Sequence, residues 1–167
     1  MININTMKIN EILLEKIENI SVTKNFFNFG SMRDLDVLET VLGRKVNKKD
    51  VKRAYLSGYI AMKVKNEVYP ALKKGDGITK GILVFNLSLL DLKKIDFYEE
   101  GLYDTTIKYV RLIADPSMVY KAQVYSKNSS KLKITNIPWN FDHYRDKLKD
   151  EYIKEVKIFM KDFTKVI

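Results

Sequence analysis

Apolar side chains recur along this chain with two different spacings, and each spacing predicts a different kind of element. The aromatic run "NFFNF" (25–29) predicts a buried strand. It is followed by "SMRDLDVLETVLGR" (31–44), whose apolar residues lie on one side of a helix: Leu35, Leu38, Val41 and Leu42. Gly43 is placed to end this helix, because glycine readily adopts the left-handed conformation of a helix C-terminus. The spacing therefore predicts a strand, a tight turn at Gly30 and a helix.

The middle of the chain is predicted to be mostly extended. The segments "VKRAYLSGYIAMKV" (51–64) and "GITKGILVFNL" (77–87) predict strands. Between them, "NEVYPALKKGDG" (66–77) predicts turns at Pro70 and at Gly-Asp-Gly. Ser88 and Asp91 form a capping-box pattern, which predicts a short helix over 89–95, and the loop "DFYEEGL" follows.

The last third predicts a hairpin, a loop and a long helix. The segments "YDTTIKYVRLIA" and "SMVYKAQVYSK" alternate like strands around Asp115-Pro116-Ser117, and "NSSKLKITNIP" has a loop composition. A helix is predicted over 140–163, capped by Asn140, with an apolar face every three or four residues: Phe141, Tyr144, Leu148, Tyr152, Val156 and Phe159. The order of elements indicates an α+β domain over 25–167, preceded by a helical extension over 1–24 that is a plausible contact for a homodimer.

Composition excludes several classes of function. The 167 residues fit one core, and there is no cysteine and a single histidine, His143, so disulfides, a zinc site and a Ser-His-Asp triad are not expected. The net charge of +9 is carried by scattered lysines with interleaved acids, which favours a solvated surface over a nucleic-acid interface. With no bilayer-length apolar run and no signal peptide pattern, a cytoplasmic protein is expected.

Four places offer candidate chemistry, and each also has a purely structural interpretation. The turn Gly30-Ser31-Met32 could present backbone N–H groups to an anion, or could be a plain helix cap. In the loop "IDFYEEGLY" (95–103), a glutamate held against aromatic rings could act as a general acid-base group, or Glu99 and Glu100 could be a solvated pair. Tyr69-Pro70 could be a packing loop, and His143 beside Trp139 a surface residue.

Taken in order, these segments resemble the gamma-glutamylcyclotransferase-like family, which includes avirulence-induced proteins and gamma-glutamylamine cyclotransferases. The segment "FNFGSM" is similar to the family's aromatic strand ending Tyr-Gly-Thr/Ser-Leu, and "AYLSGYIAMKV" to its Ala-x-Leu-x-Gly-Tyr strand. "YPALKKGDGITKGILVFNLSLLDLKKID", "IDFYEEGLY" and "AQVYSK" match three further blocks, and the likeness covers residues 25–127. "WNFDHYRDKLKDEY" resembles the Trp-rich final helix of some members.

The resemblance implies a small mixed β-barrel flanked by helices, with a cavity between the glycine turn and the glutamate loop. By motif position Glu99, four residues before Tyr103, matches the catalytic glutamate. The resemblance further implies substrate-binding residues, namely Phe29, Gly30, Ser31, Met32, Tyr69 and Tyr103. Two positions depart from the family pattern: Phe29 replaces a tyrosine, and Glu100 replaces a glycine.

The resemblance implies a transferase or lyase that needs no cofactor and acts in glutathione metabolism. The α-amine of a γ-glutamyl substrate attacks its own γ-carbonyl, which releases 5-oxoproline and an amine or amino acid, with Glu99 as general acid-base. Two alternatives remain open: a small-molecule-binding member of the same fold that has lost catalysis, and an anion- or RNA-binding module.

Overall fold

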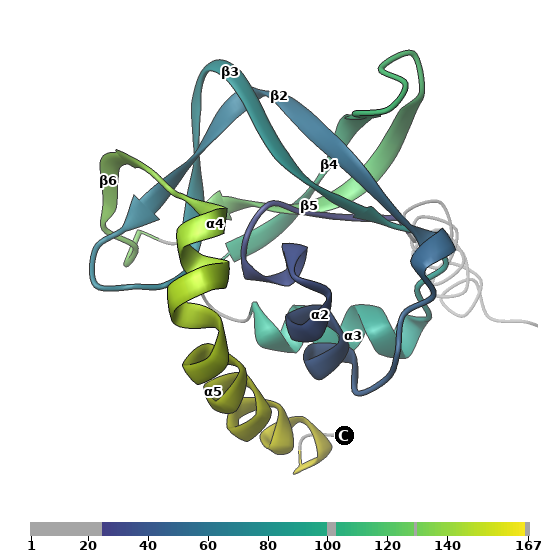
Figure 1. Ribbon diagram of the computed structural model, residues 1–167, viewed down its shortest axis with the longest axis vertical. Coiled ribbons are helices and arrows are strands. Elements are labelled where there is room, and N and C mark those ends of the chain that lie inside the picture. The colour runs from purple at the N-terminus through teal and green to yellow at the C-terminus, as the bar shows by residue number, and fades with distance from the viewer. Residues whose placement is uncertain (1–24, 100–102, 129, 166–167) are drawn as a thin grey trace, which may run out of the picture.

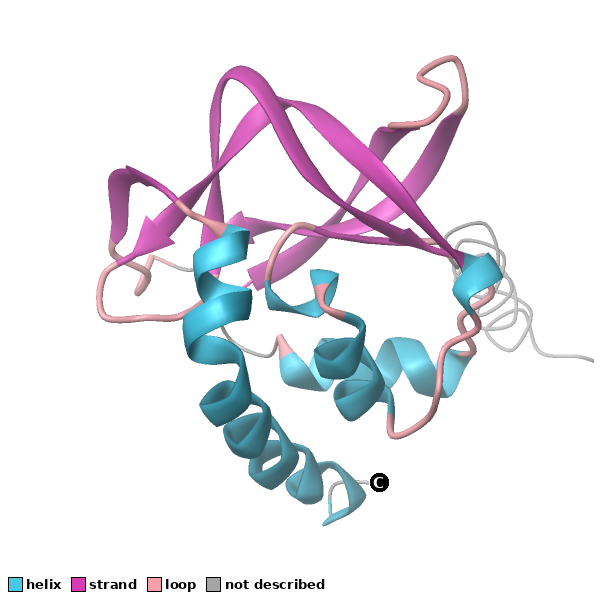
Figure 2. Cartoon of the chain, viewed as in Figure 1, coloured by secondary structure: helices cyan, strands magenta, loops and turns pink. Residues whose placement is uncertain are grey.

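The computed structural model describes residues 25–99, 103–128 and 130–165. The strands lie together, and the helices pack against one side of them (Figure 1, Figure 2). The strands are β1 (Phe26–Asn28), β2 (Val51–Val64), β3 (Pro70–Val84), β4 (Tyr103–Leu112), β5 (Val119–Asn128) and β6 (Ile134–Pro138). The helices are α2 (Leu35–Leu42), α3 (Leu89–Tyr98), α4 (Phe141–His143) and α5 (Lys149–Lys161), with short 3-10 turns at Ser31–Arg33, Lys48–Asp50 and Asp162–Lys165. The extension predicted over 1–24 lies outside the described residues.

Five of the strands close into a barrel. Their order is β3-β1-β5-β4-β2, and β2 pairs in turn with β3 to complete the ring, while β6 adds to the edge of β2. The barrel is mixed, because β1 runs antiparallel to β3 but parallel to β5. Each strand pair other than β1–β5 is antiparallel in the described part of the chain. This confirms the predicted small mixed barrel flanked by helices.

The turn predicted at Gly-Asp-Gly is wrong, since β3 already begins at Pro70 and contains all three residues. Ser57 pairs with Ile78 and Tyr59 pairs with Lys74, so residues 75–77 face Gly58 alone as a bulge. Such bulges bend long strands, as closure of a small barrel requires. The exposed residues of this part of β3 need no apolar side chains, which explains why its sequence pattern is not typical of a strand.

Three further sequence-based boundaries also differ. The segment 128–138 contains the strand β6 and not only a loop, and Met62 pairs there with Pro138. The helix predicted from residue 31 starts at Leu35, because the Asp34 side chain accepts the Asp36 N–H as an N-cap. The capping box at Ser88 and the helix stop at Gly43 are confirmed. The helix α3 continues to Tyr98, so it includes the first three residues of the loop predicted over 96–102.

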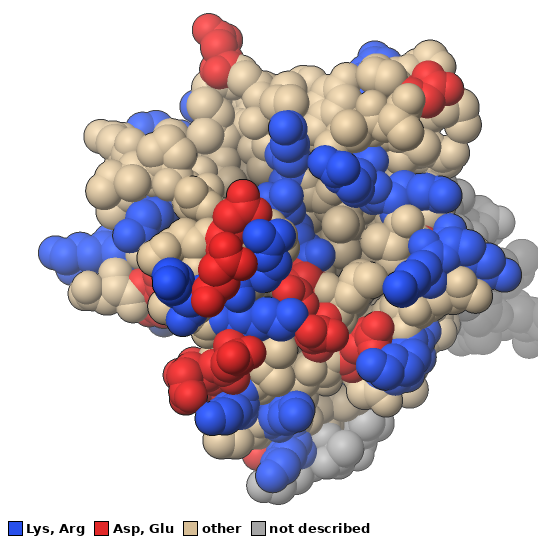
Figure 3. Space-filling model, viewed as in Figure 1, with Lys and Arg blue, Asp and Glu red and all other residues tan. Residues whose placement is uncertain are grey.

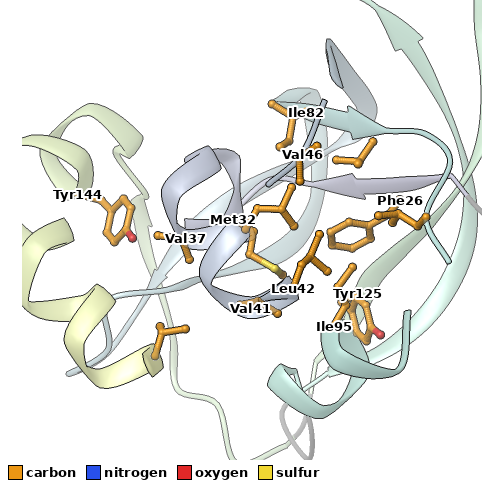
Figure 4. Close-up of a cluster of buried hydrophobic side chains, with 14 residues drawn as sticks. Phe26, Met32, Val37, Val41, Leu42, Val46, Ile82, Ile95, Tyr125 and Tyr144 are labelled. Atoms are coloured by element: carbon orange, nitrogen blue, oxygen red, sulfur yellow. The ribbon is translucent and has the colours of Figure 1, made fainter. Parts of the chain in front are cut away.

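The chain buries two apolar clusters, one on each face of β1. Phe27 and Phe29 belong to a cluster inside the barrel, together with Leu83 and Val110. Phe26 belongs to the cluster between barrel and helices (Figure 4). Alternate residues of a strand point to opposite faces, so Phe26 packs in one cluster and Phe27 and Phe29 pack in the other.

The final helical segment changes its pitch near its start. Asn140 caps it as predicted, accepting the His143 N–H, and a π-helical turn spans Tyr144–Leu148. The Lys149 N–H bonds the Tyr144 carbonyl five residues back. Lys149 thus replaces Leu148 on the inner side, where its Nζ lies 2.9 Å from Asp34 Oδ2. Leu148 was predicted on the apolar face and is instead 37% exposed. No helix of the described residues is long and apolar enough to cross a membrane.

Candidate active site

A cavity of about 300 Å³ lies on the helix side of the barrel, at the end of β1. It is bounded by the turn after β1, the start of β3, the end of α3 and one face of α5. The residues that line it are Phe27, Asn28, Phe29, Gly30, Ser31, Tyr69, Pro70, Tyr98, Glu99, Tyr103, Tyr125, Tyr152, Glu155, Val156 and Phe159. Most of the lining is aromatic, with few polar groups, which is typical of a small-molecule site.

The turn at Gly30 is shaped by its neighbours in the fold. A Cβ at this position would lie 3.2 Å from Pro70 Cδ, so glycine allows the proline ring to pack close to the turn. The Gly30 N–H donates to the side-chain Oδ1 of Asn28 at 2.9 Å. This N–H therefore already has a partner within the protein.

A chain of hydroxyl groups crosses from the turn to α5. Ser31 Oγ and the Tyr98 hydroxyl are 2.9 Å apart, and the Tyr98 hydroxyl is hydrogen-bonded to that of Tyr152. Burial raises the pKa of the Tyr98 phenol well above its usual range. These groups are therefore neutral donors and acceptors at physiological pH, and they join three separate elements at the cavity wall.

Tyr69 and Tyr103 form an aromatic corner opposite this chain. Their rings meet edge to face with centroids 6.2 Å apart, and the Tyr103 hydroxyl donates to the Pro70 carbonyl at 2.8 Å. Burial, together with the Glu67 carboxylate, raises the pKa of Tyr69 to about 12. The corner fixes the segment that packs against Gly30.

Glu99 is the residue at the C-terminal end of α3, where its N–H bonds the Ile95 carbonyl. Its side chain is partly buried against the aromatic lining. Burial raises the pKa of this carboxyl to about 8, with a further contribution from the negative charge of Asp96. A carboxyl group with a pKa near neutrality can both accept and donate a proton under physiological conditions.

The charge inside the cavity is opposite in sign to that of the whole chain. Lys and Arg are interspersed with Asp and Glu over the visible surface (Figure 3), and the chain carries a net charge of +9. Among the described residues that line the cavity, the charged ones are Glu99 and Glu155, and none is Lys, Arg or His. No group of three His, Asp or Glu in the described part of the chain is placed to hold a metal ion.

Six of the seven residues implicated by sequence meet at this cavity: Phe29, Gly30, Ser31, Tyr69, Glu99 and Tyr103. The Met32 side chain does not line it, and lies fully buried in the cluster between barrel and helices (Figure 4). His143 is exposed and stands outside the lining.

Sequence reasoning missed several of the lining residues, and the best signal for them was in the final helix. Tyr152, Val156 and Phe159 recur at helical spacing, a pattern interpreted only as a packing face. Tyr152 indicated that part of this face contacts polar groups, because a buried hydroxyl needs a hydrogen-bonding partner. Asn28, inside an aromatic strand, gave a similar sign.

The closed mixed barrel and this aromatic cavity together define the class of fold. A family model described as gamma-glutamyl cyclotransferase, AIG2-like, matches residues 26–158, and the chain belongs to this family. No curated protein shows significant similarity to the sequence.

Solved structures share the fold. An Arabidopsis thaliana protein with a known solution structure superposes with a TM-score of 0.58 at 23% identity, over 84% of this chain and 83% of that one. A second Arabidopsis thaliana protein gives 0.55 at 22% identity, over 82% and 90% of the two chains. A structure titled gamma-glutamyl cyclotransferase gives 0.47 at 12% identity, over 80% and 85%.

Proposed function

We propose that this protein is a gamma-glutamyl cyclotransferase that uses Glu99 as its general acid-base group. The observation that carries the proposal is the placement of Glu99 in a largely aromatic cavity beside the Gly30 turn, with its pKa raised to about 8. Membership of the family supports the same reaction.

The reaction needs a folded substrate and the movement of one proton. The α-amine nitrogen of the γ-glutamyl group forms a bond to the γ-carbonyl carbon, and the bond from that carbon to the leaving nitrogen breaks. Glu99 takes the proton released from the attacking nitrogen and gives it to the leaving nitrogen, so the products are 5-oxoproline and a free amine.

The charge of the lining favours one kind of leaving group. A γ-glutamyl amino acid, like glutathione, carries a second carboxylate, which would lie near the charged Glu155 at the rim of the cavity, without a basic side chain among the described lining residues. A γ-glutamyl amine lacks that carboxylate and avoids the repulsion. Our proposed substrate class is therefore γ-glutamyl amines, and no step of the reaction involves a metal or nucleotide.

The test is release of 5-oxoproline from γ-glutamyl amines, γ-glutamyl amino acids and glutathione, comparing the parent with Glu99→Gln. We expect release by the parent and a loss of roughly a thousand-fold in the variant, which keeps the shape of the side chain but has no proton to exchange. No release by a folded parent from any compound would contradict the proposal and leave a binding role for the cavity.

A further inference from the structure

The cavity has no basic side chain among its described lining residues, yet the proposed substrate carries a carboxylate that it must bind. This argument rests on the proposed function: a γ-glutamyl group carries an α-carboxylate, which must be held while the α-amine attacks. Proteins usually bind carboxylates with Arg, Lys or free backbone N–H groups. The described lining residues include no Lys or Arg, and the Gly30 N–H is already donated to Asn28 Oδ1. The donors left for a carboxylate are neutral side chains and the other backbone N–H groups of the turn.

Most neutral donors in the cavity already have partners. The Tyr103 hydroxyl donates to the Pro70 carbonyl, and the Tyr125 hydroxyl donates to Asp96 Oδ1 at 3.1 Å. The Tyr69 hydroxyl interacts with the Glu67 carboxylate. The hydroxyl groups of Ser31, Tyr98 and Tyr152 are hydrogen-bonded to one another.

Asn28 is the exception. Its residue is only 7% exposed, and it lines the cavity at the end of β1. The bond from the Gly30 N–H identifies the oxygen end of its amide, so the nitrogen end is Nδ2, with two N–H donors. Among the described residues, no acceptor lies within hydrogen-bonding distance of Nδ2, and this atom is not sealed from solvent.

Because Nδ2 is open to the cavity, its N–H groups can bond water there or a ligand that displaces the water. Natural sequences keep such groups where a ligand or water completes the hydrogen bonds. The residue stands on the strand that precedes the turn, and its own side chain is fixed by the Gly30 N–H. Its N–H groups are thus held in place before any ligand arrives.

We propose that Asn28 binds the α-carboxylate of the substrate through its Nδ2–H groups. Asn28 thereby adds to the anion-binding donors that the sequence indicated at the Gly30-Ser31-Met32 turn: the Gly30 N–H holds the amide oxygen, and the amide nitrogen holds the carboxylate. The site selects an α-carboxylate attached to a five-atom γ-glutamyl or 5-oxoproline skeleton.

The test measures binding separately from turnover. 5-Oxoproline carries the carboxylate, and 2-pyrrolidinone is the same ring without it. In protein labelled with ¹⁵N, we expect the side-chain amide resonances of Asn28, assigned by through-bond correlation, to shift with 5-oxoproline and to stay unchanged with 2-pyrrolidinone. This readout needs no substitution.

Variants then give the size of the effect. Asn28→Asp keeps an oxygen for the Gly30 N–H but removes both donors, so we expect 5-oxoproline affinity to fall roughly ten- to a hundred-fold. Asn136→Asp is the matched control, because it makes the same change at an exposed position of β6 whose Oδ1 accepts from Lys73. We expect its affinity to equal that of the parent.

Each outcome decides the matter. Unshifted Asn28 resonances, equal affinity of parent and Asn28→Asp, or no binding of 5-oxoproline at all would overturn the assignment. Binding that depends on Asn28, without release of 5-oxoproline from any γ-glutamyl compound, would confirm the carboxylate site and contradict the proposed reaction instead.

Discussion

The two faces of β1 show how one short strand serves two purposes. The face that carries Phe27 is turned into the barrel, where it packs on Leu83 and Val110 in a dry cluster. The opposite face carries Phe26 and Asn28, and next to it the helices leave a cavity with polar groups. The barrel face lacks polar groups to do chemistry, and the helix face keeps several that packing alone does not need. The polar groups that β1 gives to the cavity therefore come from the helix face, while Phe27 and Phe29 of the barrel face contribute only apolar lining.

The largest expected effect comes from a substitution in β3 that forces β1 out of its place. A Cβ at Gly81 would lie 2.2 Å from the Asn28 carbonyl oxygen and 2.8 Å from the Phe27 ring. We expect Gly81→Ala to lower the free energy of unfolding by roughly 4 kcal/mol or more, because backbone must move. Chemical denaturation followed by circular dichroism measures the change.

Gly30→Ala is the control for this prediction. Its Cβ would meet the Pro70 ring at 3.2 Å, a side-chain contact that a small shift can relieve. We expect a loss of about 1 kcal/mol. If Gly30→Ala lowered the free energy of unfolding as much as Gly81→Ala, the close approach of β1 to β3 at Gly81 would not be the special constraint that we infer.

A smaller effect, opposite in sign, is expected on the cavity face. Between pH 4.5 and about 8 the folded protein keeps a proton on Glu99 that the unfolded chain releases, so this group lowers stability as pH rises through that window. Glu99→Gln removes the dependence. At pH 9 we expect the variant to be more stable than the parent by roughly 1–3 kcal/mol.

Urea unfolding of both proteins at pH 5 and pH 9 checks this. At pH 5 most of the difference should vanish, because the folded parent then holds the proton. A difference that is the same at both pH values would show that Glu99 is not the titrating group.

The smallest effect concerns the choice of leaving group. Glu155 lies on α5 at the exposed rim of the cavity. Replacing it with Gln should raise kcat/KM for glutathione relative to a γ-glutamyl amine by about two- to five-fold, since an exposed charge acts weakly through water. Competition between the two substrates measures the ratio, and an unchanged ratio would mean that Glu155 does not influence selection.

The sequence was most informative where local chemistry decides structure. The stop at Gly43, the capping box at Ser88 and the cap at Asn140 were predictable, because each depends on residues a few positions apart. The bulge at Gly75–Gly77 was not, since it follows from closure of the barrel and from pairing with β2.

The same limit applies to the candidate site. Motif spacing identified Glu99 and the Gly30 turn, but Tyr152 and Glu155 reach the cavity only because α5 packs across more than fifty residues of intervening chain. The π-helical turn at Tyr144–Leu148 shifts which residues face inward, and no periodicity fixed at 3.6 residues predicts that shift.

The central claim is that Glu99 exchanges the proton of the reaction within this cavity. The most direct measurement is the rate of 5-oxoproline release from a γ-glutamyl amine across pH 5–10, for the parent and for Glu99→Gln. We expect kcat/KM of the parent to rise with pH and to level off above about 8, where Glu99 is deprotonated, with the variant inactive throughout. An equal rate in the variant, or a parent profile that is flat across this range, would contradict the account.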